Sequence, residues 1–347
     1  MRPNLFNFAT SELSQDGFLC WLLSWAKADY EKENPLLHLV GKDFLNLIYQ
    51  RAGAALQVEF SNVEIRKQDG NIDILCLVNG KEKAILIEDK VGTKQHSNQL
   101  EIYKEYVTKT LGFASDNVIS VYIQTGDQSD YSEVLKQGYL VFERKDLLVI
   151  LENVNGKAAR LKSDILDDFS NRLRKIEDSV QSFLNLPPEQ WGWNAWKGFY
   201  AHLQNTLKAG GWDYVANPSG GFLGFWWYFR GNVDYQLNLQ IEYKNKQRKF
   251  CFRICVKDAT KRRAFRQHLH NMVVVECLKH KIKAKRPDHF GSGKYMTVAL
   301  LDQPFPAIDS KGLLDMQETI KIIYSAQAVL DACLSTVKAE INHANND

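Results

Sequence analysis

Residues 71–103 of this 347-residue chain read NIDILCLVNGKEKAILIEDKVGTKQHSNQLEIY. Two apolar runs, Ile72–Val78 and Ala84–Ile87, flank the turn-forming pair Asn79–Gly80. Short apolar runs on both sides of Asn-Gly are typical of a β-hairpin with a tight turn. The stretch therefore predicts two antiparallel strands, and the rest of the fold is arranged around them.

Ionisable residues occupy the ends of both predicted strands. Asp73 lies near the start of the first strand, and Glu88, Asp89 and Lys90 end the second. Because side chains alternate along a strand, Glu88 and Lys90 share one face and Asp89 points away. Pairing across the turn brings Asp73 next to Glu88. Isolated charges there would be costly, and a divalent cation between the carboxylates would offset their repulsion. The alternative is a cross-strand salt bridge at an exposed hairpin end, worth less than about 1 kcal/mol.

The motifs resemble those of a known family. A helix predicted over about residues 95–111 carries Gln99 and Tyr103 four positions apart, hence on one face. Asp73, a turn and Glu88-Asp89-Lys90 resemble the D…(D/E)-X-K signature of the PD-(D/E)XK nuclease superfamily. Gln99-Leu100-Glu101-Ile102-Tyr103 resembles the Q-x-x-x-Y motif of its RecB-type exonuclease branch. Ile72 stands where that signature often has Pro.

The resemblance implies an α/β fold and a metal-dependent reaction. The fold would be restriction-endonuclease-like, with an α-β-β-β-α-β core and a mixed sheet flanked by helices. Asp73 and Glu88 would bind Mg²⁺ (or Mn²⁺) directly, with the main-chain carbonyl of Asp89 as a third oxygen. Lys90 would orient the attacking water. Glu12 would hold a second metal or an outer-shell water.

Three further side chains have expected roles. By the same resemblance, Gln99 and Tyr103 would fix Lys90 or a substrate phosphate through hydrogen bonds. The side chain of Asp89, on the opposite strand face, is expected to be a solvated acid at the sheet end. Glu12 also has a simpler interpretation, because an acid in the first turn of a helix complements the helix dipole.

The order of predicted elements agrees with this core. A helix over residues 12–28, after the cap Ser11, has Leu13, Phe18, Leu22 and Trp25 on its apolar stripe. Further along the chain, the patterns predict a helix at 37–52, a strand at 55–67 bent near 61–62, strands at 117–124 and 139–142, and helices at 146–152 and 163–184.

Pro187-Pro188 predicts the boundary between two domains, residues 1–186 and 187–347. The second domain is expected to be α+β with an antiparallel sheet. Its predicted strands span 222–230, 235–243 and 249–256, and its predicted helices span 191–208, 261–279 and 315–341.

Positive charge is concentrated in the second domain. Residues 244–286, which we call the basic segment, contain fifteen Lys and Arg against two acids, Asp258 and Glu276. Fifteen minus two is +13, so the rest of the chain must sum to −10 to give the net charge of +3. Such a segment is typical of a protein that binds a phosphate backbone. Of the adjacent Trp226 and Trp227, one should face the core, and the other could stack on a base.

Other features place the protein in a broad class. Six scattered cysteines without a CxxC pair predict reduced core residues rather than disulfides. The chain has no apolar signal core and no apolar run approaching about 20 residues, so we expect a cytoplasmic protein that does not enter membranes.

Three functions are consistent with these patterns. The first is a metal-dependent nuclease that cleaves DNA in restriction, phage defence or repair. The second is a non-catalytic nucleic-acid-binding protein that retains the nuclease fold, against which the intact Asp73, Glu88 and Lys90 argue. The third is an interaction protein whose segment 315–341 drives oligomerisation, for example into a homodimer. DNA against RNA, endonuclease against exonuclease, and sequence preference stay open.

Overall fold

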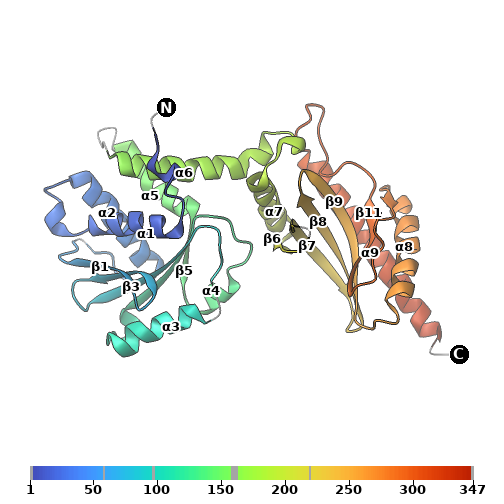
Figure 1. The fold of residues 1–347 in the computed structure, drawn as a ribbon, viewed down its shortest axis with the longest axis horizontal. Helices are drawn as coiled ribbons and strands as arrows, with labels where there is room; N and C mark the ends of the chain where they lie inside the picture. Colours follow the sequence, from blue (N-terminus) through green and yellow to red (C-terminus); the bar gives the residue numbers. More distant parts are fainter. Residues whose placement is uncertain (1–2, 58, 96–97, 158–162, 219, 345–347) are drawn as a thin grey trace. The chain divides into compact units, whose positions relative to one another are not determined.

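The computed structural model describes residues 3–57, 59–95, 98–157, 163–218 and 220–344. The chain forms two compact units, residues 1–178 (unit 1) and 179–347 (unit 2) (Figure 1). The division falls a few residues before the boundary predicted at 186/187. Each unit has its own sheet and its own core.

Unit 1 contains a mixed sheet of five strands in the order β1-β2-β3-β4-β5. The first three are antiparallel neighbours, whereas β3, β4 and β5 run parallel. The strands are β1 (Val63–Asp69), β2 (Ile72–Val78), β3 (Lys83–Lys90), β4 (Val118–Gln124) and β5 (Leu140–Glu143). With the helices, this sheet has the predicted α-β-β-β-α-β order, so the α/β fold expected from the sequence is confirmed.

Helices cover both faces of this sheet (Figure 1). They are α1 (Glu12–Ser24), α2 (Pro35–Arg51), α3 (Gln99–Glu105, continued by a π-helical turn Tyr106–Thr110), α4 (Ser132–Lys136), α5 (Arg144–Lys157) and α6 (Asp164–Gln181). Along β3, Ile85 and Ile87 pack with the core formed by α1, α2, α5 and α6, whereas Leu86 packs with α3. A strand buried on both faces must be apolar throughout, which explains the continuous apolar run of β3.

Close packing of α1 against α2 fixes the position of α1 over the sheet. A Cβ atom added to Gly41 of α2 would lie 2.6 Å from the main-chain oxygen of Leu22 in α1 and 2.8 Å from the main-chain nitrogen of Ala26. Only glycine permits this approach of the two backbones. The first turns of α1 are thereby placed next to the ends of β2 and β3.

Two local predictions for unit 1 are wrong. The strand predicted from residue 55 begins only at Val63; residue 58 lies outside the described residues. The main-chain N–H and C=O of Gln57 bond instead to the side chain of Asn46 on α2, at 3.1 and 3.3 Å, so this segment is held by a helix rather than by a neighbouring strand. On α1, the predicted stripe residue Leu13 is 61% exposed.

Unit 2 is α+β, with six antiparallel strands in the order β10-β11-β9-β8-β7-β6. The strands are β6 (Gly211–Val215), β7 (Phe222–Gly231), β8 (Tyr235–Lys244), β9 (Gln247–Val256), β10 (Ala284–Lys285) and β11 (Tyr295–Leu301). The helices are α7 (Trp193–Leu207), α8 (Arg262–Lys279) and α9 (Met316–Ala344). The predictions found β7, β8, β9 and all three helices, and missed β6, β10 and β11.

Large aromatic side chains fill the core of unit 2. Trp196, Phe225 and Trp227 are buried there. Trp226, on the other face of β7, is only partly buried, as the alternation of a strand requires. The six cysteines are free thiols, four of them buried. Within the described ranges, no helix combines the length and apolar character needed to cross a membrane.

Candidate active site

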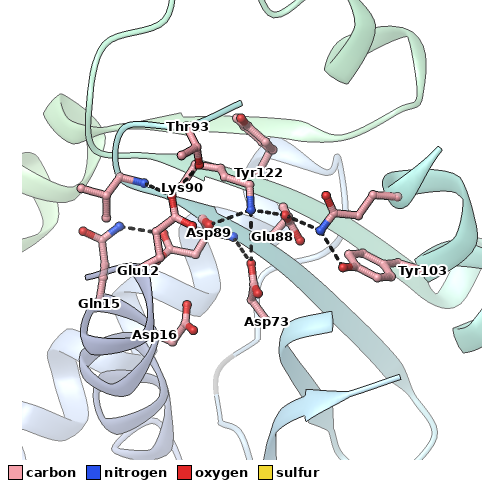
Figure 2. A network of polar contacts seen from close by, with 12 residues as sticks. Glu12, Gln15, Asp16, Asp73, Glu88, Asp89, Lys90, Thr93, Tyr103 and Tyr122 are labelled. Atoms are coloured by element: carbon pink, nitrogen blue, oxygen red, sulfur yellow. Dashed lines mark hydrogen bonds and ion pairs between the residues drawn. The ribbon is translucent and has the colours of Figure 1, made fainter. Parts of the chain in front are cut away.

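Two carboxylates lie opposite each other where β2 begins and β3 ends (Figure 2). Ile74 pairs with Ile87 in the antiparallel ladder, so Asp73 and Glu88 are the next opposed residues. This is the juxtaposition expected from the Asn-Gly turn. Asp73 also accepts a hydrogen bond of 2.9 Å from the main-chain N–H of Asp89, which fixes the side chain against the end of β3.

The ammonium of Lys90 lies between these acids (Figure 2). Its Nζ forms an ion pair with Glu88, lies 3.9 Å from Oδ2 of Asp73 and donates to the main-chain oxygen of Asp89 at 3.3 Å. Burial disfavours the charged form of Lys90, but the bond to Glu88 and the charges of both acids outweigh it, so the pKa of Lys90 is raised. Lys90 is therefore a buried, permanently charged ammonium at neutral pH.

Glu88 is strongly perturbed by its surroundings. Burial and the charge of Asp73 raise its pKa to about 7, although Lys90 opposes them. Its Oε2 is buried and has no hydrogen-bond partner among the described residues. An orphaned buried oxygen beside a second carboxylate is a favourable position for a cation.

Gln99 of α3 holds the other oxygen of Glu88. Its Nε2 donates to Oε1 of Glu88 at 2.8 Å and to the hydroxyl of Tyr103 at 2.6 Å. The prediction that Gln99 and Tyr103 approach the site on one helix face therefore agrees with the structure. Their contact differs from the expected one, because Gln99 bonds the carboxylate rather than Lys90.

Glu12 reaches the site from the first turn of α1. Its Oε1 accepts hydrogen bonds from the main-chain N–H of Val91 (3.2 Å) and the hydroxyl of Thr93 (2.6 Å), just after β3 ends. Its charge contributes to the raised pKa of Lys90. In this arrangement Glu12 joins α1 to the chain that follows the site and adds negative charge near Lys90.

The side chain of Asp89 points to the opposite face, as predicted, but the expectation that it is solvated is wrong. It is fully buried under α1 beside the carboxyl group of Asp16, and Nε2 of Gln15 donates to its Oδ1 at 2.7 Å. Burial raises the pKa of Asp89 well above its usual range, although the hydrogen bond from Gln15 opposes this shift. The charges of Asp16 and Asp73 raise the pKa further. Burial and the charge of Asp73 raise that of Asp16 to about 6.

Asp16 and Gln15 are therefore site-supporting residues that the sequence reasoning missed. The sequence spacing could have indicated both residues, because Glu12, Gln15 and Asp16 lie at i, i+3 and i+4 on one face of a helix. Asp89, the partner of Asp16, lies 73 positions further along the chain (89 minus 16). Only the packing of α1 against β3 brings the two residues together.

The residues present fit a hard divalent cation. Asp73, Glu88 and the main-chain carbonyl of Asp89 offer oxygen atoms, the ligands that Mg²⁺ and Mn²⁺ prefer. Across the described part of the chain, no three His, Cys, Asp or Glu side chains gather closely enough to form a metal site by themselves. Glu12, expected to hold a second metal or an outer-shell water, accepts hydrogen bonds from Val91 and Thr93 in this structure.

A mixed sheet that presents two acids and a lysine at the end of one hairpin defines a class of nuclease. A family model for the PD-(D/E)XK nuclease superfamily matches residues 3–177, about half of the chain. The chain belongs to the PD-(D/E)XK nuclease superfamily. No curated protein and no solved structure gave a match. The family match spans all the elements of unit 1 that carry the candidate site.

Proposed function

We propose that unit 1 hydrolyses phosphodiester bonds in DNA with a bound divalent cation, Mg²⁺ or Mn²⁺. The observation that carries this proposal is the cluster of Asp73, Glu88 and Lys90 in a chain of the PD-(D/E)XK nuclease superfamily. A structural salt bridge is the competing explanation for the cluster. It leaves Oε2 of Glu88 without a partner and the pKa of this acid raised to about 7, whereas a bound cation would relieve both.

The two carboxylates would hold the cation together with the main-chain oxygen of Asp89. When bound, it supplies Lewis acidity toward the phosphate and makes water a better nucleophile at neutral pH. Asp73 is already oriented for this task by the N–H of Asp89, and Glu88 by Gln99. Glu12, bonded to Val91 and Thr93, would add an outer acid near the same position.

Lys90 would act on the substrate. Its ammonium has three donors and is charged at neutral pH, because its pKa is raised. It can donate a hydrogen bond to the attacking water and stabilise the charge that develops on a phosphate oxygen. The contacts of its ammonium group with Glu88 and Asp73 hold the side chain in position for that role.

Gln99 and Tyr103 would be positioning residues, as in the RecB-type arrangement that their spacing resembles. The amide of Gln99 bridges Glu88 and the Tyr103 hydroxyl, so it fixes which carboxylate oxygen stays directed at the site. Groups that orient a ligand in this way typically contribute about 10–100-fold to metal affinity or activity.

The experiment compares wild type with Asp73→Ala and Lys90→Ala on linear DNA, covalently closed circular DNA and RNA, in Mg²⁺, Mn²⁺ and EDTA. Cleavage of DNA by wild type only, with a divalent cation only, supports the proposal, and attack on closed circles would identify an endonuclease. Preference for RNA would replace the proposed substrate. Cleavage that persists in Asp73→Ala would contradict the proposed site.

A further inference from the structure

A pocket of about 610 Å³ opens in unit 2, at the end of the sheet where β9 begins and β11 ends. Its origin is a mismatch in strand length. β9 pairs with β8 from Gln247 onward, but its pairing with β11 starts only at Cys251. Residues 247–250 therefore extend beyond β11, and the chain after β11 turns away through residues 302–305 to leave a recess.

The wall of this recess is cationic and its floor is apolar. Lys246, Arg248, Lys249 and Lys285 contribute positive charge. Asp288 and Asp302 also line the pocket, so its formal charge is four minus two, or +2. Phe250 and Phe305, whose rings meet edge to face with centroids 4.9 Å apart, form the buried floor together with leucine side chains of β11.

The cationic side chains of this wall differ in whether an acidic side chain of the protein already pairs with them. Lys285 lies 2.9 Å from Asp302, and Arg248 lies 2.9 Å from Glu189. Within the described part of the chain, neither Lys246 nor Lys249 forms an ion pair or a side-chain hydrogen bond. Both lysines are exposed and line the same pocket, so an anion bound there would meet two cations that the protein does not already pair.

We propose that this pocket binds the phosphate of a nucleotide, with Lys246 and Lys249 as its cationic contacts. The volume lies in the range of about 300–1,000 Å³ that is usual for small-ligand pockets. Eight of its thirteen lining residues are polar or charged, which suits the phosphate and sugar of a nucleotide. Asp302 is neutralised by Lys285 and so opposes a phosphate little. Asp288 remains as the acid that a bound phosphate must avoid.

The nucleotide has two sources, a nucleic-acid strand or a free nucleotide. A nucleic-acid strand bound in the pocket would be the substrate of unit 1, so this version of the proposal rests on the proposed function of unit 1. Binding of a free nucleotide does not depend on that function. The pocket is lined in part by the basic segment, whose charge of +13 suits a polyanion better than a single nucleotide.

The test uses the full chain in EDTA, so that binding is measured without cleavage. Wild type is compared with the double variant Lys246→Gln/Lys249→Gln and with the matched double variant Lys257→Gln/Lys281→Gln, which removes the same charge from the basic segment outside the pocket. Fluorescence anisotropy measures binding of a short labelled single-stranded DNA over a series of salt concentrations. Calorimetry measures binding of AMP and ATP.

Loss of the two lysines is expected to weaken DNA binding about tenfold or more, because charge-assisted hydrogen bonds are lost. The slope of log K against log salt concentration should become shallower by roughly 1–2. The matched variant should show a smaller change in affinity. Binding of AMP or ATP that the same variant abolishes would identify free nucleotide as the ligand.

Equal binding of all probes by wild type and the Lys246→Gln/Lys249→Gln variant would overturn the proposal, as would a wild type that binds no probe. Mg²⁺-dependent cleavage by wild type, measured in parallel, separates the two claims. If cleavage is normal and the pocket variant binds like wild type, the pocket proposal fails while the nuclease function stands.

Discussion

The buried pair Asp16 and Asp89 makes the stability of unit 1 depend on pH. The folded protein holds their protons more tightly than the unfolded chain, since the pKa of Asp16 rises from 3.8 to about 6 and that of Asp89 also rises. A group of this kind contributes its full stabilisation below its unfolded pKa and loses it as pH rises through the folded pKa. The contribution of the pair to the free energy of unfolding should therefore decrease as pH rises from about 4 through the folded pKa values, which are about 6 for Asp16 and raised for Asp89.

Asp89→Asn should remove the part of this pH dependence that comes from Asp89. An asparagine keeps the acceptor for Gln15 and gives Asp16 a permanent donor, so it imitates the protonated pair. We expect the free energy of unfolding at about pH 8 to rise by on the order of 1–3 kcal/mol, with little change at about pH 5. Urea unfolding at both pH values measures the change.

The exposed Asp116→Asn serves as the control, and it should change stability by less than about 0.5 kcal/mol at either pH. An Asp89→Asn protein that is no more stable than wild type at about pH 8 would show that the buried pair is not a source of instability.

Gln99→Leu should alter the pH dependence of cleavage. The variant removes the amide donor from Glu88 Oε1, and a carboxylate that loses a hydrogen bond is harder to ionise. The pKa of Glu88, already raised to about 7, should rise further. The acidic limb of the rate profile should then move to higher pH, and the rate near neutral pH should fall by about 10–100-fold.

Tyr103→Phe is the matched variant, because it removes only the second acceptor of the Gln99 amide and should have the smaller effect. A Gln99→Leu protein that is slower but has an unmoved acidic limb would mean that Gln99 does not act through Glu88.

At the scale of elements, Arg144 holds together three segments around the site. Located at the start of α5, it donates to Glu177 of α6 (2.8 and 3.0 Å), to Asp127 (2.9 and 3.1 Å) and to the main-chain oxygen of Thr125 (2.7 Å). The hydroxyl of Thr125 in turn bonds Gln15, which bonds the Asp89 side chain. This series of contacts links α5, α6 and the end of β4 to the side chain of Asp89, on the sheet face opposite Glu88 and Lys90.

Arg144→Ala should destabilise unit 1 by about 3–5 kcal/mol, because it leaves the buried Glu177 and the half-buried Asp127 without this partner. Urea unfolding gives the value. Lys109→Ala is a suitable comparison, because its ion pair with Glu105 is exposed and should contribute less than about 1 kcal/mol. A change below about 1 kcal/mol for Arg144→Ala would show that the buried network is not required for stability.

Local patterns predicted the elements that carry the candidate site. The Asn79–Gly80 pair predicted the hairpin, in which a four-residue connection, residues 79–82, sets the register that opposes Asp73 and Glu88. The four-residue spacing puts Gln99 and Tyr103 on one helix face. Elements that depend on tertiary contacts were missed or misplaced. β10 has only two residues, and the segment near Gln57 is held by Asn46 rather than by a strand.

At the scale of the whole molecule, the two units differ in their charge and in their cores. The acids of the candidate site are gathered in unit 1, whereas unit 2 carries the basic segment with its charge of +13. The strand-alternation argument correctly separated Trp226 from the buried Trp227, but no local pattern marks the recess at the start of β9, because it arises from unequal pairing with β8 and β11.

The most direct test of the account is the rate of Mg²⁺-dependent DNA cleavage by full-length Glu88→Gln. Glutamine keeps the shape of the side chain and an acceptor for Gln99, and it removes the charge that would hold the cation. The same substitution at Glu82, an exposed residue at the turn of the same hairpin, is the control. Glu88→Gln should stay folded, because glutamine fills the same space and Asp73 remains as a counter-charge for Lys90. Glu82→Gln changes an exposed side chain and should also stay folded.

We expect Glu88→Gln to cleave about a hundredfold more slowly than wild type or worse, because the carboxylate would ligate the cation directly. Glu82→Gln should be within about threefold of wild type, as is usual for a surface change away from the reaction. If Glu88→Gln instead cleaves DNA as fast as the Glu82→Gln control, the acids at the end of the β2–β3 hairpin are not the catalytic site.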